Sequence, residues 1–211
     1  MMATASNIQS FYQWLKNPSS ILSLIASILS IITFIFVYVD KGKIEILLPH
    51  NLGIGISANT KNFDFLVSAA YSNTGAPRTR HHIQHITASI KSLGKATALD
   101  GKYNWTYEQR FVGADEYLSK HRDKKDEGLR DYLEYVSRAI PFTLKGGEST
   151  AKTIELEGAK SVDLLLPPRL QLELTVHANT GSYTTSAIYV CPNVSPVVEE
   201  VIYCEREEKS N

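Results

Sequence analysis

Residues 169–178 read RLQLELTVHA, and the alternation of apolar and polar side chains in this stretch decides the fold class. The apolar positions are Leu170, Leu172, Leu174 and Val176, and the polar positions between them are Gln171, Glu173, Thr175 and His177. Successive side chains of a strand point to opposite faces, so the pattern predicts a strand with one buried face. The turn residues 179–182 (NTGS) then lead into a second strand pattern, from Tyr183 to Cys191.

The same period of two recurs in the preceding part of the chain. It appears at Ile44, Ile46 and Leu48, along 63–71, at 86–90, at 142–144, at 154–156 and at 162–166. Such short strands with one apolar face and turns between them predict an antiparallel β-sandwich over 43–194. The turn 71–75 (YSNTG) after a long strand and the segment 140–149 (IPFTLKGGES) resemble single-pass membrane proteins with an immunoglobulin-like exposed domain. This resemblance implies an immunoglobulin-like sandwich over about 60–190.

Two segments depart from the strand pattern. Residues 111–139 carry two helical patterns, Phe111/Ala114/Leu118 and Leu129/Tyr132/Leu133/Val136, which predict a helical insertion. Residues 195–211 begin with Ser195 and Pro196, a capping residue followed by the first helical position. The tail therefore predicts a short helix followed by a frayed end, with a strand as the alternative.

Residues 21–39, ILSLIASILSIITFIFVYV, contain no charge, proline or glycine. At about 1.5 Å per residue, such a helix spans roughly 28 Å, close to the hydrocarbon thickness of a bilayer. The segment lacks the basic start and the small-residue cleavage site of a signal peptide. It predicts a single transmembrane helix that acts as an uncleaved signal anchor.

Residues 1–20 precede this helix and place apolar side chains on one helical face. Ile8, Phe11, Tyr12 and Leu15 follow the spacing of an amphipathic helix, and Trp14 is a typical headgroup-level residue. The pattern predicts a short helix in the membrane interface. The alternative is an N-terminal extension of the membrane helix.

Within the apolar segment and at its start, Ser20, Ser23, Ser27 and Ser30 recur at spacings that place them on one stripe. Small hydroxyl residues on one face allow helices to approach closely, so the stripe predicts self-association into a homo-oligomer. In the alternative, each hydroxyl bonds to a carbonyl of its own helix and the stripe faces lipid.

The positive charges that flank the apolar segment predict on which side of the membrane the β domain lies. Lys16 lies before the apolar segment, whereas Lys41 and Lys43 follow it, and the side with more positive charge is usually cytoplasmic. This predicts a plasma (inner) membrane protein with a cytoplasmic β domain. Cys191 and Cys204 can form a disulfide in an oxidising compartment or stay as two thiols.

The densest group of functional side chains is PRTRHHIQH, residues 77–85. Arginine pairs well with phosphate or carboxylate groups, so a candidate anion site consists of Arg78, Arg80, His81 and His82, joined by Lys120 and Arg122 if the insertion folds beside them. His81 and His85 would share a face about 13 Å apart, and adjacent histidines would point to opposite faces, so no metal site is predicted. The alternative is a solvated basic loop.

These observations favour a non-enzymatic, membrane-anchored binding protein that self-associates, because no catalytic motif is present. The alternative is a ligand-gated membrane effector whose β domain binds an anionic nucleotide-type messenger. The expected partners are the lipid bilayer, copies of the chain, and a protein or an anionic small ligand, with no cofactor. Lys plus Arg and Asp plus Glu both number 22, which argues against a nucleic-acid polymer as partner.

Overall fold

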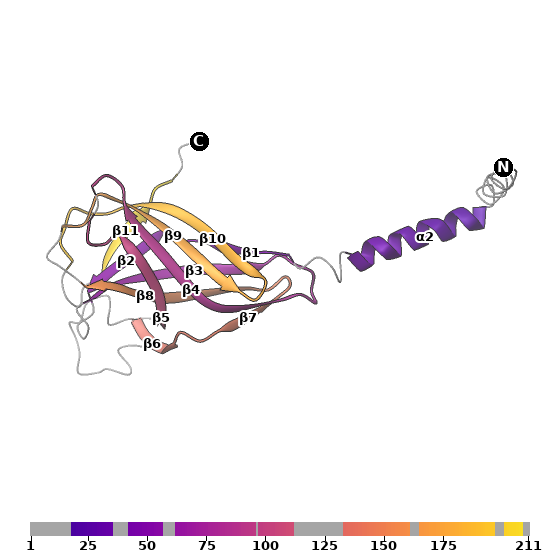
Figure 1. Cartoon of the computed structure of the whole chain (residues 1–211), viewed down its shortest axis with the longest axis horizontal. Coiled ribbons are helices and arrows are strands. Elements are labelled where there is room, and N and C mark those ends of the chain that lie inside the picture. Colours follow the sequence, from indigo (N-terminus) through magenta and orange to yellow (C-terminus); the bar gives the residue numbers. More distant parts are fainter. Residues whose placement is uncertain are drawn as a thin grey trace, which may run out of the picture.

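A computed structural model describes residues 18–35, 42–56, 62–95, 97–111, 133–160, 165–196 and 201–208 (Figure 1). Its elements are one helix, α2 (Pro18–Phe34), and the strands β1 (Ile44–Leu47), β2 (Asn51–Ile56), β3 (Asn62–Asn73), β4 (Arg80–Ser92), β5 (Gly101–Phe111), β6 (Leu133–Arg138), β7 (Phe142–Lys145), β8 (Ser149–Lys160), β9 (Arg169–Ala178), β10 (Gly181–Val190) and β11 (Ile202–Arg206). The prediction of a mainly β, antiparallel domain is confirmed.

All of the strands belong to one sheet. The order β5-β8-β3-β2-β11-β10-β9-β4 returns to its start because β4 also pairs with β5, so these strands form a closed ring. Strands β1, β6 and β7 extend it by pairing with β3, β5 and β4, respectively. The sandwich of two separate sheets, predicted from the strand pattern, is therefore replaced by a single continuous sheet. The long strand β4 connects its parts, since it pairs with β9 on one side and with β7 and then β5 on the other.

The core lies inside this ring, on the apolar faces that the sequence predicted. The side chains of Phe63, Phe65, Val67, Ala69 and Tyr71, and those of Leu170, Leu172, Leu174 and Val176, are fully buried. A strand with one buried face cannot shift its register by one residue without exposing that face. The alternation at 169–178 therefore both forms the strand and fixes its pairing.

Tyr103 is a large side chain at the centre of this core. Its ring lies edge-on to Phe65 with 4.6 Å between ring centroids, and its hydroxyl donates to the carbonyl of Leu99 at 2.8 Å. A Cβ atom on Gly158 would lie 2.3 Å from this ring, closer than atoms can approach. Gly158 is therefore required where the ring packs against strand β8.

Helix α2 carries the apolar segment of the chain. No helix in the described part of the chain is both long and apolar enough to cross a membrane. The end of the predicted span, 36–39, and the predicted interfacial segment up to residue 17 lie outside the described residues. The hydroxyl of Ser27 donates to the carbonyl of Ser23 at 2.9 Å, so this member of the serine stripe bonds within its own helix.

Two predicted helical segments differ from the structure. In the tail, residues 197–200 of the expected helix lie outside the described residues. Residues 202–206 form strand β11, the alternative to a helix, because their main chain completes the ring between β2 and β10. In the predicted insertion, residues 112–132 lie outside the described residues and 133–138 form strand β6. There the helical pattern was misleading, because Tyr135 packs edge-on against Tyr107 of the neighbouring strand β5.

Cys191 and Cys204 form a disulfide bond, with 4.3 Å between their Cα atoms. The bond joins the residue after β10 to the middle of β11. Among the described residues, strand β11 pairs with β10 through Tyr189/Arg206 and Val190/Glu205 alone. The disulfide therefore holds β11 beside β10, where few main-chain hydrogen-bonded pairs join the two strands.

Candidate functional site

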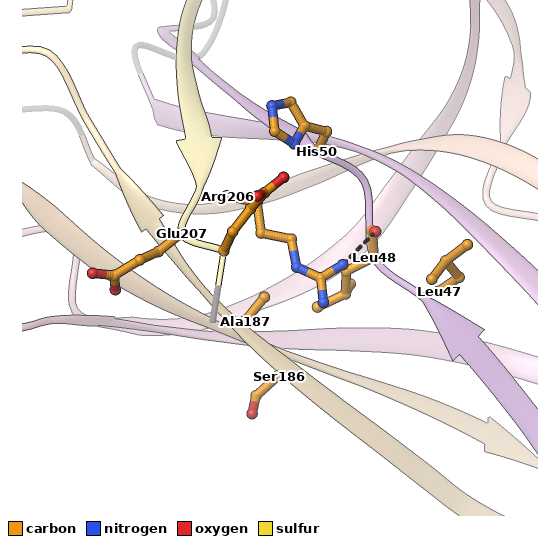
Figure 2. A pocket seen from close by; sticks show the side chains of 8 residues that line it. Leu47, Leu48, His50, Ser186, Ala187, Arg206 and Glu207 are labelled. Atoms are coloured by element: carbon orange, nitrogen blue, oxygen red, sulfur yellow. Dashed lines mark hydrogen bonds between the residues drawn. The ribbon is translucent and has the colours of Figure 1, made fainter. Parts of the chain in front are cut away.

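A cleft of about 600 Å³ opens where strand β11 ends, between β1 and β10 (Figure 2). It exists because β11 is shorter than the strands beside it. The lining residues are Leu47, Leu48, His50, Ser186, Ala187, Arg206, Glu207 and Glu208. Strands β1 and β10 approach within 8 Å between Cα atoms, but no strand pairing joins them among the described residues.

Arg206 holds the inner wall of this cleft. Its guanidinium donates to the carbonyl of Leu48 at 3.2 Å, and its backbone N–H donates to the carbonyl of His50 at 2.7 Å. Figure 2 shows the imidazole of His50 on one side of Arg206 and the carboxylate of Glu207 on the other. Glu207 is paired with Arg169 at 2.5 Å. Arg206 is therefore positioned by the bend between β1 and β2, and Glu207 by Arg169 on β9.

Tyr189 holds the same segment between β1 and β2, since its hydroxyl donates to the carbonyl of Pro49 at 3.0 Å. Burial raises the pKa of Tyr189 to about 12, although nearby Arg206 acts in the opposite direction. The hydroxyl thus stays protonated and keeps this bond at physiological pH. Pro49 lies in the bend between β1 and β2, so the bond fixes the bend that shapes the cleft.

The cleft combines an apolar floor with main-chain polar groups. Leu48 is buried, whereas Leu47 is 67% exposed at the rim. The backbone N–H of Glu207 donates to the carbonyl of Ile188, so this residue of β10 faces β11. Since main-chain groups alternate sides along a strand, those of Ser186 also face the cleft rather than β9. This arrangement suits an apolar side chain carried on a peptide.

The predicted anion site is only partly brought together. Arg80 and His82 lie on the exposed face of β4, and Arg78 lies exposed in the turn before it. His81 is instead fully buried, and its Nδ1 lies 2.5 Å from the hydroxyl of Thr180. It belongs to the core side of the strand and is no part of a surface site. Lys120 and Arg122 lie outside the described residues.

A bulge in β4 overturns the predicted relation of His81 to His85. The register with β9 shifts between Ile83 and His85, which places Gln84 and His85 both on the exposed side. An extra residue in one strand reverses the faces that follow it. His81 and His85 therefore lie on opposite faces. Among the described residues, no group of His, Cys, Asp or Glu side chains is suited to holding a metal ion.

The bulge brings His85 against His177 of β9. Their rings are stacked, with 4.1 Å between centroids and 12° between planes. The two ring nitrogens of His177 lie 3.1 Å from the hydroxyl of Thr87 and 3.0 Å from that of Ser182. Burial, and then the charge of His85, lower the pKa of His177. His177 is therefore stabilised in its neutral form.

We predict that the β domain loses stability in mild acid through His177. Because its folded pKa is lowered, the unfolded chain takes up the proton first, so this contribution is present above about pH 6.5 and is lost below it. Melting temperatures at neutral and mildly acidic pH should show a smaller acid-induced drop in His177→Gln than in the natural chain. The control His82→Gln, at an exposed histidine of β4, should keep the full drop. Equal drops in both variants would contradict the assignment.

The comparisons with known proteins do not place this chain in a family: no protein-family model matches it, and no curated protein matches its sequence. Sequence reasoning missed the cleft and its Arg206. That residue lies in a stretch expected to fray. The other residues that line the cleft with it, such as Leu48 and Ser186, come from distant parts of the chain. Only the closure of the ring brings them together.

Proposed function

We propose that this protein is a membrane-anchored binding protein, non-enzymatic, whose β domain takes up a partner at the cleft. The exposure of helix α2 carries the anchoring part of the proposal. Every large apolar side chain from Ile21 to Ile35 is between 41% and 67% exposed, on all sides of the helix. A helix that is apolar all round is stable only when lipid or protein surrounds it.

The sequence around α2 supports lipid as that surrounding. The helix and the apolar residues that follow it, Ile35 to Val39, carry no charge. Backbone polar groups are satisfied within a helix, which is what a bilayer requires of a spanning segment. Self-association through Ser20, Ser23, Ser27 and Ser30 stays a prediction beside this one.

Charges in the helix are expected to release the protein from membranes. The variant Ile25→Arg with Ile28→Arg places two cations in the apolar segment, where each is strongly unfavourable in a bilayer. Carbonate washing of membranes should then leave the natural chain in the pellet and move the variant to the supernatant. A control with Val190→Arg and Val194→Arg, exposed valines of the β domain, should stay in the pellet. Release of the natural chain itself would refute anchoring.

The cleft supports binding of a protein segment, because its apolar floor and rim lie beside main-chain groups on β10. A photo-crosslinking residue at Leu47 should capture a partner in intact membranes. Ser186→Trp should abolish this product by filling the cleft, whereas Ser182→Trp, on the same strand outside it, should not. A product that Ser186→Trp leaves unchanged would rule out the cleft as the binding site.

The disulfide bears on orientation. Disulfides persist in oxidising compartments and are rare in the cytosol. We therefore propose that the β domain lies outside the cytoplasm. This is opposite to the expectation from Lys41 and Lys43, which exceed the single Lys16 on the other side of the apolar segment by one positive charge. Alkylation of intact cells before lysis decides the matter: free thiols at Cys191 and Cys204 would restore the cytoplasmic placement.

A further inference from the structure

The turns at the end of the β domain that follows α2 are joined into one unit, here called the helix-proximal end: residues 42–43, 74–79 and 145–148. The N–H of Thr74 donates to the carbonyl of Lys43 at 3.0 Å. The N–H of Gly147 donates to the carbonyl of Asn73 at 2.8 Å, and that of Gly146 to Thr79 at 2.9 Å. Three chain segments therefore form a single surface.

Buried Asn73 makes this end rigid. Its Nδ2 donates to the carbonyl of Leu144 at 3.1 Å, and its Oδ1 accepts the N–H of Gly75 at 2.9 Å. The backbones also approach very closely, since a Cβ atom on Gly146 would lie 1.8 Å from the carbonyl oxygen of Ala76. The side chains carried by these turns are thus held at fixed relative positions.

This end exposes cations on adjoining elements. Arg78 lies in the turn before β4, and Arg80 on β4 is directly opposite Lys145 on β7. Like charges placed opposite each other on paired strands are unfavourable for folding. Among the described residues of this end, the acid Glu45 pairs with Lys43 at 3.2 Å, and the carboxylate of Glu148 accepts the backbone N–H of Lys145 at 2.8 Å. Arg78, Arg80 and Lys145 together present positive charge.

Covalent connectivity places these cations near the end of α2. Seven residue steps separate Ile35 from Gly42, and an extended chain spans at most about 25 Å over that length. Figure 1 shows the turns beside β1 and β7 at the end of the domain nearest to α2. In a chain anchored by α2, this end therefore faces the membrane surface.

We propose that Arg78, Arg80 and Lys145 bind anionic lipid headgroups of the membrane that α2 enters and so fix the β domain against it. The proposal rests on the membrane anchoring proposed above. Guanidinium and ammonium groups are the usual protein partners of phosphate and carboxylate, and basic residues beside a membrane helix are attracted to anionic lipids. The contact would also relieve the repulsion between Arg80 and Lys145.

The test uses the full chain in vesicles, with a fluorophore on the variant Pro77→Cys in the same turn. The natural cysteines are joined in the disulfide, so the new thiol alone is labelled. Vesicles contain phosphatidylcholine alone or with a minor share of phosphatidylserine, plus a headgroup-labelled quenching lipid. We expect stronger quenching with phosphatidylserine and loss of the difference in high salt, because salt screens exposed charges.

Charge-removal variants assign the effect to these residues. Each cation removed should lower the equilibrium constant for headgroup contact by about fivefold, so Arg78→Gln, Arg80→Gln and Lys145→Gln together should abolish the phosphatidylserine effect. The matched control removes three exposed cations at the opposite end of β4: Lys91, Lys95 and Lys102. This control should leave the phosphatidylserine effect on quenching unchanged.

The outcomes separate this proposal from the anchoring on which it rests. Flotation of the same samples reads anchoring directly. Protein that floats with both vesicles but shows equal quenching overturns the headgroup contact and leaves anchoring intact, whereas protein that fails to float overturns both. A melting temperature raised by a soluble nucleotide, and lost in the triple variant without any lipid effect, would instead assign the cations to the ligand of a gated effector.

Discussion

Replacing Tyr103 with alanine is expected to lower the free energy of unfolding of the β domain by about 3–5 kcal/mol, the usual effect of removing a buried aromatic side chain. The ring is fully buried and packs against Phe65, so its loss leaves a cavity inside a closed sheet. Strands that are paired on both sides cannot move inward to fill it. Thermal unfolding should show a melting temperature lower by roughly 10 °C.

Two further variants separate the ring from its hydroxyl and test its packing. Tyr103→Phe keeps the ring and leaves the carbonyl of Leu99 without its donor, which should cost about 1–3 kcal/mol. Gly158→Ala should cost a similar amount by overpacking the ring. In a Tyr103→Ala background that cost should nearly vanish, because the obstructing ring is gone. Gly101→Ala, whose Cβ would meet the same ring at 3.8 Å, is the control with little effect. Additive costs of Gly158→Ala and Tyr103→Ala would contradict this packing.

Removing the disulfide is the second large effect. The bond closes a loop over a sequence separation of 13, and a loop of this size contributes about 3 kcal/mol by restricting the unfolded chain. The double variant Cys191→Ala with Cys204→Ala should therefore unfold at clearly lower denaturant concentration. Since few main-chain pairs join β11 to β10, the loss should also loosen Arg206 at the cleft.

Chemical reduction provides the control for that variant. A reducing agent should lower the stability of the natural chain toward that of the double variant and leave the double variant itself unchanged. Equal stability of the reduced and oxidised natural chain would show that the bond has no role in stability.

The sequence predicted the strands best where one apolar face alternates without interruption. The buried sets on β3, β4 and β9 all lie where the period of two placed them, because burial of alternate residues is a local property of a strand. The sequence also predicted the turn at Gly181. Its φ of 141° is unfavourable for residues with a side chain, which explains why a glycine stands there. Local patterns of this kind do not show which strands become neighbours.

The remaining features depend on pairing between distant segments. The bulge before His85 is set by its register with β9, and no feature of PRTRHHIQH indicates it. Leu133 and Val136 fit a helix in isolation, yet pairing with β5 draws them into β6. The cleft arises from the difference in length between β11 and its neighbours. For the candidate site, the sequence indicated the basic residues Arg78 and Arg80 but gave no sign of Arg206.

Closure of the ring has a consequence for how the protein folds. Strand β11 must insert between β2 and β10, and Arg206 bonds to Leu48 across 158 positions of sequence. Folds dominated by such non-local contacts have a high contact order and fold slowly, because loop entropy is lost before the contacts form. During synthesis, β2 and β10 must wait with unsatisfied edges until residues 202–206 emerge. The chain thus depends on β11 to cover the edges of β2 and β10 and so to prevent their mispairing.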